Sequence, residues 1–186
     1  MDVELKTEFR LNHEIELRAW RESDLEVVFA AVSKNSEHLQ TFMRWMKPDY
    51  SIDDARTFLT EAVVARKERT NLGLGIFRRE ELIGSIGLSR FDWTAQRAEI
   101  GYWIDKDFEG KGIVTLASQR LIDYAFNELK LNRVEIRCSA ENRRSAIIPL
   151  KLGFQKEGTF RQSEFLHGRF HDFYTFGLLA DDPRLW

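Results

Sequence analysis

The sequence predicts a mixed α+β fold, in which helices flank a central sheet. Three observations support this class: apolar residues in the first third repeat at helical spacing, those between 72 and 104 follow strand patterns, and strand and helix patterns then alternate up to a terminal hairpin. The 186 residues are 43% hydrophobic, which is enough for the core of one ordinary domain. No repeat or low-complexity linker divides the chain, so residues 1–186 are expected to form a single domain.

The first third is predicted to be helical after a short strand at 15–17. Ser23 and Glu26 form a capping-box pattern, which indicates the start of the first helix. A second, short helix is expected at 39–46, ending before a proline, and a third is expected at 51–63.

Strand patterns dominate from residue 72 onward. The predicted strands are 72–78, 82–91, 97–104, 134–138, 154–161, 164–166 and 171–179. A helix at 113–129 is apolar on more than one face, as expected for a helix buried against a sheet. A last helix at 142–152 stops at Gly153, in the position where glycine commonly ends a helix.

Composition excludes several classes of protein. The chain has 28 Lys and Arg against 30 Asp and Glu, a net charge of −2, so it has no bulk basic field for nucleic acid. A single cysteine cannot form an internal disulfide or a multi-thiolate metal site, which suits a reducing compartment. No run approaches the roughly 20 apolar residues of a membrane span, and the acidic N-terminus lacks a secretory signal. We therefore expect a cytoplasmic protein without a nucleic-acid or membrane partner.

Gly110, Lys111 and Gly112 lie between a predicted strand and a helix N-terminus, where unpaired N–H groups and the helix dipole favour an anion. Two common phosphate motifs do not fit this segment. A P-loop requires glycine where Asp105 stands and a hydroxyl residue where Gly112 stands. The dinucleotide fingerprint requires a third glycine where Thr115 stands. The anion-binding prediction therefore stands without either motif.

Five strings together resemble one family. They are AEIGYWI at 98–104, FEGKGIVTLA at 108–117, NRVEIR at 132–137, ENRRS at 141–145 and KLGF at 151–154. Their order and spacing are similar to those of the GCN5-related N-acetyltransferases, and within them to the bacterial branch that acetylates the N-termini of ribosomal proteins. The resemblance implies a mostly antiparallel sheet whose strands 97–104 and 133–139 splay to bind acetyl-CoA. One departure is Asp107, where the wider family prefers glutamine or arginine.

The resemblance also implies which residues bind coenzyme A. Its pyrophosphate would lie on the backbone N–H groups of the loop and the helix start, and its pantetheine arm would add like a strand beside 102–104. Asn142 would either bridge the pantetheine amides or cap the following helix. The stretch 133–151 has a local excess of three positive charges, which could hold the terminal phosphates or simply face solvent. The expected cofactor-binding residues are Tyr102, Trp103, Ile104, Glu109, Gly110, Lys111, Gly112, Ile113, Val114, Thr115, Asn142, Arg144 and Lys151.

Two residues are the candidate catalytic groups. Ser145 matches the serine that lies near the leaving sulfur in related enzymes, where it would stabilise the thiolate or return a proton. It could instead bond the backbone in the first helical turn. Glu99 matches the position of a base in other members, although a strand glutamate is commonly just solvent-facing, and Glu164 is the alternative base. Pro149 inside the same helix offers no N–H to the carbonyl of Ser145, so a kink is expected.

The remaining reactive side chains are predicted to have structural rather than catalytic roles. Cys138 lies on the apolar face of its strand, which favours a buried thiol and direct transfer over an acyl-enzyme. His167 and His171 have no third ligand pattern, so we expect no metal.

The acceptor is the least defined part of the prediction. Six aromatic and apolar residues could either line the acceptor groove or belong to the core: Trp20, Phe42, Trp45, Met46, Trp93 and Phe165. The branch resemblance favours a protein N-terminus such as that of a ribosomal protein. A polyamine, amino sugar or antibiotic amine stays open, as does a non-catalytic module that only binds coenzyme A. Strands 164–179 and the tail could form the edge of a homodimer.

Overall fold

The computed structural model describes residues 4–186, and within this range eight strands form one sheet in the order β1-β2-β3-β4-β5-β6-β8-β7. The strands are β1 (Glu8–Arg10), β2 (Ile15–Ala19), β3 (Asn71–Arg78), β4 (Glu81–Asp92), β5 (Arg97–Ile104), β6 (Arg133–Ser139), β7 (Gln155–Leu166) and β8 (Arg169–Leu179). Neighbouring strands pair antiparallel throughout, except for the parallel pair β5 and β6. The predicted mixed fold with a mostly antiparallel sheet is confirmed.

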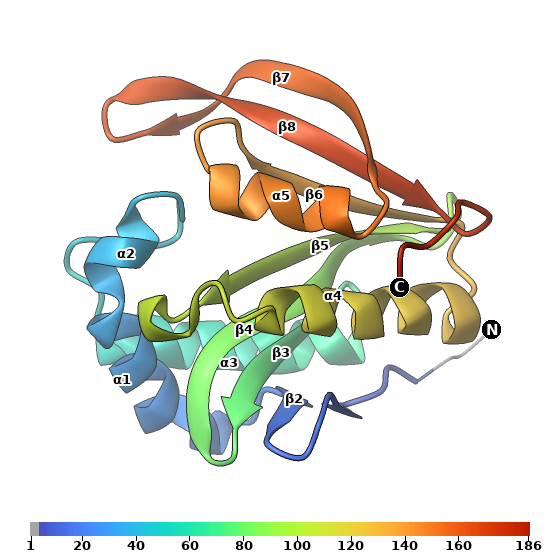
Figure 1. Ribbon diagram of the computed structural model, residues 1–186. Coiled ribbons are helices and arrows are strands. Elements are labelled where there is room, and N and C mark those ends of the chain that lie inside the picture. Colours follow the sequence, from blue (N-terminus) through green and yellow to red (C-terminus); the bar gives the residue numbers. More distant parts are fainter. Residues whose placement is uncertain (1–3) are drawn as a thin grey trace.

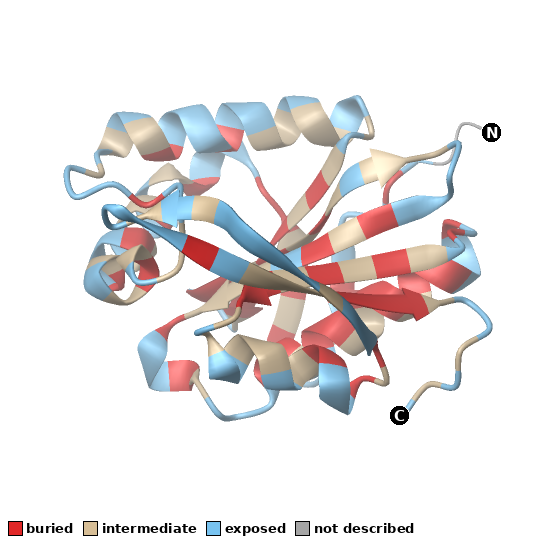
Figure 2. Cartoon of the chain, turned by 90° about the horizontal axis from the view of Figure 1, so that it is seen from above, coloured by how far each residue is buried: buried red, intermediate tan, exposed pale blue. Residues whose placement is uncertain are grey.

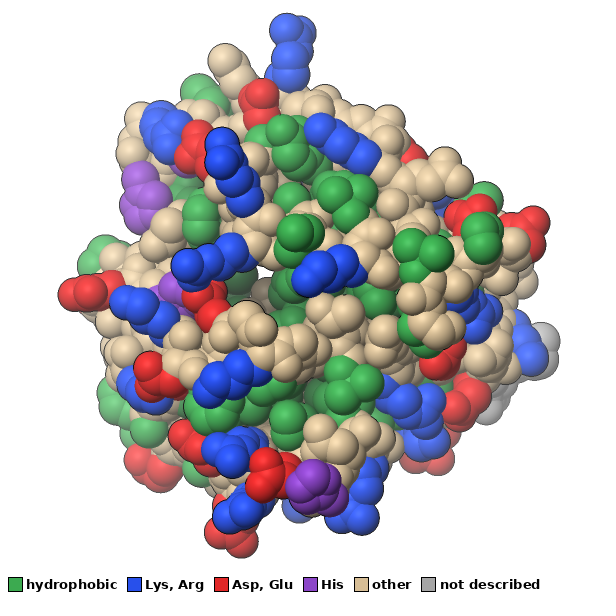
Figure 3. Space-filling view, in the orientation of Figure 1, with side chains coloured by type: hydrophobic (Ala, Val, Ile, Leu, Met, Phe, Trp, Pro, Cys, Tyr) green, Lys and Arg blue, Asp and Glu red, His purple; other side chains and the backbone are tan. Residues whose placement is uncertain are grey.

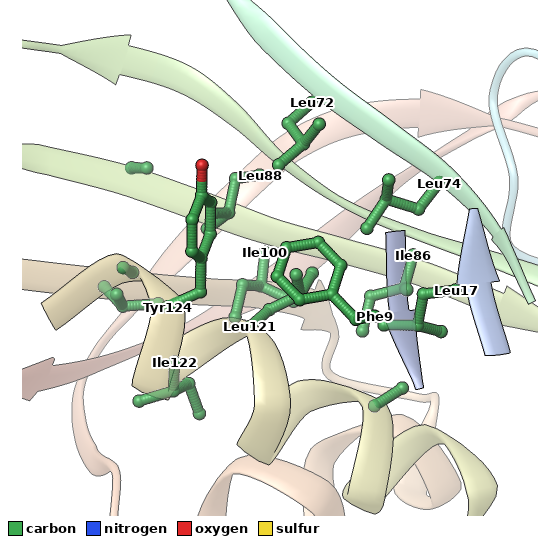
Figure 4. Close-up of a cluster of buried hydrophobic side chains, with 14 of the residues drawn as sticks. Phe9, Leu17, Leu72, Leu74, Ile86, Leu88, Ile100, Leu121, Ile122 and Tyr124 are labelled. Carbon is green, nitrogen blue, oxygen red and sulfur yellow. The ribbon is translucent and has the colours of Figure 1, made fainter. Parts of the chain in front are cut away.

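Helices cover both faces of this sheet (Figures 1 and 2). They are α1 (Leu25–Lys34), α2 (Ser36–Gln40), α3 (Ile52–Lys67), α4 (Ile113–Asp123) and α5 (Arg143–Lys151). Helix α4 packs on one face over a cluster that includes Leu72, Ile86 and Leu121, each fully buried (Figure 4). On the other face α1 and α3 enclose a second cluster around Trp20 and Leu59. Alternating side chains of the central strands supply both clusters, which is why β3 and β4 are apolar on both faces.

The first helix begins differently from the prediction. The Asp24 carboxylate accepts the Arg21 N–H at 2.8 Å ahead of the helix, and the predicted capping box of Ser23 and Glu26 does not mark its start. Asp24 is buried because the Arg18 guanidinium holds it with two hydrogen bonds of 2.9 and 3.0 Å. This tertiary ion pair fixes the start of the element, a short 3₁₀ turn (η1, Glu22–Asp24) that leads into α1.

Two other helical boundaries also differ. Helix α2 spans Ser36–Gln40, so the predicted helix at 39–46 ends early and its remaining apolar residues pack from a turn. The predicted helix at 113–129 is regular only to Asp123 and then widens into a π turn at Tyr124–Glu128. The predicted start of the third helix is confirmed: Ser51 caps α3, and its Oγ accepts the Asp54 N–H at 3.3 Å.

Strand β7 runs continuously through the segment that was predicted as two strands. Its pairing with β8 shifts between Phe160 and Glu164, which is the interruption that the sequence pattern reflected. The hairpin of β7 and β8 extends past the rest of the sheet towards α2 (Figure 1). There the ring of His167 contacts the carbonyl of Gln40 at 2.6 Å.

Strands β5 and β6 separate halfway along their length, as the family resemblance implied. Their parallel register covers four residue pairs and ends at Ile100 opposite Ile136. Beyond that point β5 stays paired with β4 up to Ile104, and β6 stays paired with β8 up to Ser139. The two strands therefore follow their outer neighbours and leave a gap, bounded by 101–104 on one side and 137–139 on the other.

Candidate active site

The gap between β5 and β6 is the centre of the candidate site. A Cβ built on Gly101, the first residue past the last pair, would meet no atom within 4 Å. Figure 3 shows a hollow near the middle of this face, rimmed by basic side chains. The backbone N–H and C=O groups along the two inner edges do not pair with each other, so an extended, amide-containing chain could bind between them as an additional strand.

Residues 109–112, called here the glycine loop, lie at one end of this gap. Gly110 and Gly112 have φ of +72° and +75°, which favours glycine, and a Cβ at either position would point into open space. Helix α4 starts at Ile113, and its first intrahelical bond is donated by Leu116 to the carbonyl of Gly112 at 3.0 Å. The preceding N–H groups have no intrahelical acceptor, and no acidic residue occupies the first turn. The loop therefore fits a phosphate, as predicted from the sequence.

A buried carboxylate anchors the loop to the first helix. Asp105 is 3% exposed and accepts hydrogen bonds from Lys34 Nζ at 2.8 Å and from Asn35 Nδ2 at 2.9 Å. Burial raises the pKa of Asp105, but the hydrogen bonds from Asn35 and Lys34 outweigh it, so the pKa lies below its usual value. Asp107, the departure from the family pattern, is mostly exposed and pairs with Lys34 at 2.9 Å. Lys34, Asn35 and Asp105 were not predicted as site residues, because no local pattern signals partners about 70 residues apart.

Two basic side chains predicted to hold phosphates lie in different places. Arg144, in the first turn of α5, contacts the Glu109 carboxylate of the glycine loop, which also faces His38 Nε2 at 3.3 Å. Lys151 lies in the last turn of α5, roughly 10 Å farther along the helix axis at the usual rise of ~1.5 Å per residue. The structure therefore brings Arg144 to the loop and leaves Lys151 exposed at the far end of the helix.

Ser145, in the first turn of α5, contacts Tyr102 of β5 beside the gap. Its hydroxyl donates to the Tyr102 phenol oxygen at 3.2 Å, and that phenol donates to the Ser145 carbonyl at 3.1 Å. Asn142 caps α5, because its Oδ1 accepts the Ser145 N–H at 3.0 Å. The capping role predicted for Asn142 is confirmed, whereas its contact with pantetheine stays a prediction. The Ser145 hydroxyl binds a side chain across the gap rather than the backbone of its own helix.

Cys138 lies beside this pair and is 5% exposed. Burial raises the pKa of its thiol, and a hydrogen bond with Ser145 only partly offsets this effect. A thiol held neutral is a poor nucleophile, so the geometry supports the prediction of a buried side chain without a covalent role.

Glu99 and Glu164 lie on the other face of the sheet. Glu99 is an even number of residues from Trp103, whose ring packs with the cluster under α1 and α3, so both point to that side. Burial raises the pKa of Glu99, although the Arg90 guanidinium at 3.6 Å opposes the shift. The charge of Glu164 also raises the pKa of Glu99, and Glu164 itself pairs with Arg44 at 2.6 Å. The candidate base and the candidate thiolate partner thus lie on opposite sides of the gap.

The predicted acceptor wall is only partly realised. Trp20 is 2% exposed among Phe58 and Phe77, so it is core. Trp93 follows the other end of β4, where it stacks on Phe91 with ring centroids 4.7 Å apart, and does not line the gap. Trp45 and Phe165 are exposed, Phe42 is partly exposed, and Met46 is buried. Aromatic spacing in the sequence could not separate these cases.

The described residues contain no cluster of three or more His, Cys, Asp and Glu side chains that could hold a metal ion. His171 is instead buried with Nε2 3.1 Å from the carbonyl of Leu166, and His167 binds the α2 backbone. The absence of a resident metal therefore stays a prediction. Within residues 4–186, no helix is both long and apolar enough to cross a bilayer.

A strand gap that accepts an amide-containing arm, next to a helix start that accepts phosphate, defines a coenzyme A-dependent acyltransferase. Comparison with known proteins agrees. Residues 14–155 match the acetyltransferase (GNAT) domain, and the chain belongs to this family. It is an acetyl-CoA-dependent N-acetyltransferase, as the resemblance implied.

Individual relatives align over nearly the whole chain. The putative ribosomal N-acetyltransferase YdaF of Bacillus subtilis (strain 168) is 34% identical over 171 residues, covering 91% of this chain and 93% of its own. The ribosomal-protein-serine acetyltransferase of Escherichia coli (strain K12) is 30% identical over 172 residues, covering 92% and 96%. A solved structure of RimL, a ribosomal L7/L12 alpha-N-protein acetyltransferase in complex with coenzyme A, superposes with a TM-score of 0.89 at 26% identity, covering 94% of this chain and 98% of that one.

Proposed function

We propose that this enzyme acetylates the α-amino group of a protein N-terminus, with a ribosomal protein as the acceptor. The observation that carries this proposal is the two-sided gap, with a hydroxyl and phenol on one face and two partly buried carboxylates on the other. The carboxylates suit an approaching ammonium group, and the two relatives named above for ribosomal acetylation cover more than nine-tenths of the chain.

The residues divide the reaction between them. Acetyl-CoA would lie in the gap, with its phosphates on the N–H groups of 109–115 and its pantetheine amides against the inner edges of β5 and β6. Arg144 and Asn142 border that path from α5. The α-amine, whose pKa is about 8, must lose a proton before it attacks, and Glu99 or Glu164 would accept that proton.

Transfer then proceeds directly. The amine nitrogen bonds to the thioester carbon, the carbon–sulfur bond breaks, and the electron pair leaves on the coenzyme A sulfur. The Ser145 hydroxyl, whose single proton is donated to the Tyr102 phenol in the free enzyme, would turn that proton towards the thiolate. The thiolate takes up the proton that the nitrogen loses as the amide forms, and it leaves as the thiol. Because a thiol and an α-amine have similar pKa values near 8, positioning contributes more to rate than strong acid or base chemistry.

An acetylation assay tests the acceptor. Purified protein is mixed with acetyl-CoA and peptides that carry ribosomal-protein N-terminal sequences, free or N-terminally blocked, and with spermidine and an amino sugar. We expect thiol release only with free N-terminal peptides, and tandem mass spectrometry should place the acetyl group on the α-nitrogen. Acetylation of a lysine side chain, or faster turnover of a small amine, would contradict the proposed acceptor. Binding of coenzyme A without turnover of any amine would indicate a non-catalytic module.

Ser145→Ala tests the residue roles. Turnover should fall roughly 10-fold or more, because a hydrogen bond to a developing anion is lost, while the Kd for coenzyme A changes little. Wild-type turnover in this variant would remove Ser145 from the mechanism.

We further propose that residues 1–186 act as one acetyltransferase domain, that the enzyme works in the cytoplasm, and that it forms a homodimer. The last point is supported by the outermost strand β7, whose side chains are mostly exposed and include Phe160 at 51%. Sedimentation equilibrium at micromolar concentration should give twice the chain mass, and Phe160→Glu should shift it towards the monomer.

A further inference from the structure

Helix α5 carries a proline at a position where helices normally donate a hydrogen bond. In a regular α-helix the N–H of residue 149 would donate to the carbonyl of residue 145, four positions earlier. Pro149 lies within the helix and is buried, and it has no N–H. The carbonyl of Ser145 therefore lacks its regular donor within the helix.

The missing donor comes from another strand. The Tyr102 hydroxyl, projecting from β5 across the gap, donates to the Ser145 carbonyl at 3.1 Å. Burial raises the pKa of Tyr102 well above its usual value, so the phenol is neutral and keeps the proton that it donates. The same phenol oxygen accepts the Ser145 hydroxyl at 3.2 Å. One side chain thus binds both the main chain and the side chain of Ser145.

Asn142 provides a third hydrogen bond that holds Ser145 in place. Its Oδ1 accepts the Ser145 N–H at 3.0 Å, so the donor, the acceptor and the hydroxyl of Ser145 each have a defined partner. Two of the three bonds come from Tyr102, which lies two residues past the point where β5 and β6 stop pairing. The phenol therefore also links β5 to the first turn of α5, near the place where the reacting sulfur is expected.

We infer that Tyr102 is a positioning residue, which fixes the Ser145 hydroxyl at the reacting end of the gap, and that Pro149 permits this by leaving the Ser145 carbonyl free for the phenol. The inference rests on the proposed role of Ser145. It assigns to the Tyr102 side chain a task separate from cofactor contact by its backbone. The loss of one helical hydrogen bond at Pro149 is then explained by its contribution to catalysis.

Steady-state kinetics of Tyr102→Phe test the positioning role of Tyr102. The variant keeps the ring and removes only the hydroxyl, so Ser145 loses two partners while the gap keeps its packing. We expect kcat to fall about 10-fold and the KM for acetyl-CoA to stay within about 2-fold. Tyr124→Phe is the matched control, because the Tyr124 hydroxyl also makes a hydrogen bond in the interior, accepting the Lys6 N–H at 2.8 Å far from the gap. That control should lose stability and keep wild-type kcat.

A double-mutant cycle that combines Tyr102→Phe with Pro149→Ala tests the role of Pro149. Alanine restores an N–H that can donate to the Ser145 carbonyl, which in Tyr102→Phe has lost its donor. We expect Pro149→Ala to raise the folding equilibrium constant about 5-fold more in the Tyr102→Phe background than in the wild type. The double variant should regain stability but keep the low kcat, because the Ser145 hydroxyl still lacks the phenol. Urea unfolding and kcat are measured on all four proteins.

The outcomes separate this inference from the proposed function. If Tyr102→Phe keeps wild-type kcat while Ser145→Ala loses it, the positioning role is wrong and the role of Ser145 stands. If Ser145→Ala also keeps wild-type turnover, both are wrong. Equal stabilisation by Pro149→Ala in the two backgrounds would show that the phenol and the helix N–H do not share the Ser145 carbonyl, and would overturn the role of Pro149.

Discussion

The Arg144 guanidinium and the Glu109 carboxylate form an ion pair that joins the first turn of α5 to the glycine loop. Both residues border the place where phosphates are expected, so Glu109 neutralises a cation that a phosphate could use. A carboxylate here also repels phosphate directly. We therefore expect the pair to oppose cofactor binding.

Replacing Glu109 with glutamine should tighten cofactor binding. The variant removes one negative charge and releases Arg144, so we expect the Kd for coenzyme A to fall about 5-fold at low salt, with a smaller change at high salt. Isothermal titration at two ionic strengths measures this effect. Glu37→Gln, at an exposed position of α2, is the control and should change the Kd little. An unchanged or weaker affinity in Glu109→Gln would show that the ion pair does not compete with the phosphates.

Gly112→Ala should weaken coenzyme A binding, because its methyl group would project into the open space where the phosphates are expected. It should also cost about 1 kcal/mol of stability, since φ at Gly112 is +75°. Gly168→Ala is a matched control: its φ is +74°, a Cβ there would also meet nothing within 4 Å, and it lies in the β7–β8 turn. Chemical denaturation should give similar losses for both variants, whereas only Gly112→Ala should raise the Kd. Equal affinities would place the phosphates elsewhere.

Cys138→Ala should retain turnover close to that of the wild type. Direct transfer needs no enzyme thiol, and burial keeps that of Cys138 protonated. Intact-protein mass spectrometry after incubation with acetyl-CoA alone should show no added acetyl group. A stable acetylated species that is absent from Cys138→Ala, together with lost turnover, would instead indicate an acyl-enzyme.

Glu99→Gln should stabilise the protein more at pH 7 than at pH 4. Burial raises the pKa of Glu99 above its unfolded value, so the native state binds its proton more tightly than the unfolded chain does. The stability linked to this proton is fully present below the unfolded pKa of about 4.3 and is lost as the pH rises through the higher folded pKa. Urea unfolding at both pH values measures the difference. The same substitution at the exposed Glu26 should show little pH dependence, and an equal gain at both pH values would contradict the assigned burial.

Local patterns were sufficient to predict the elements that frame the expected cofactor site. The glycine loop, the strands 97–104 and 133–139, and the cap at Asn142 each depend on residues close together in the chain, and all three lie where expected. The capping box of α3 is local in the same way.

Predictions that depended on contacts between different elements were less successful. Asp24 accepts the Arg21 N–H and is held by Arg18 of β2, and Asp105 anchors the loop through Asn35, 70 residues away. Neither pairing leaves a periodic signal in the sequence. Trp93 shows the same limit: its aromatic character fits a pocket or a surface stack equally well, and its contacts with Phe91 and Arg69 are set by the folded structure.

The short ladder between β5 and β6 has a consequence for the mechanics of the whole sheet. Four residue pairs are the main hydrogen-bonded connection between the β1–β5 half and the β6–β8 half of the sheet. In the free enzyme, the backbone amides of 101–104 and 137–139 that face the gap should therefore exchange rapidly with deuterated solvent. A bound arm of coenzyme A would protect amides on both sides at once and join the halves. The cellular supply of acetyl-CoA would then govern not only turnover but also how cooperatively the protein unfolds.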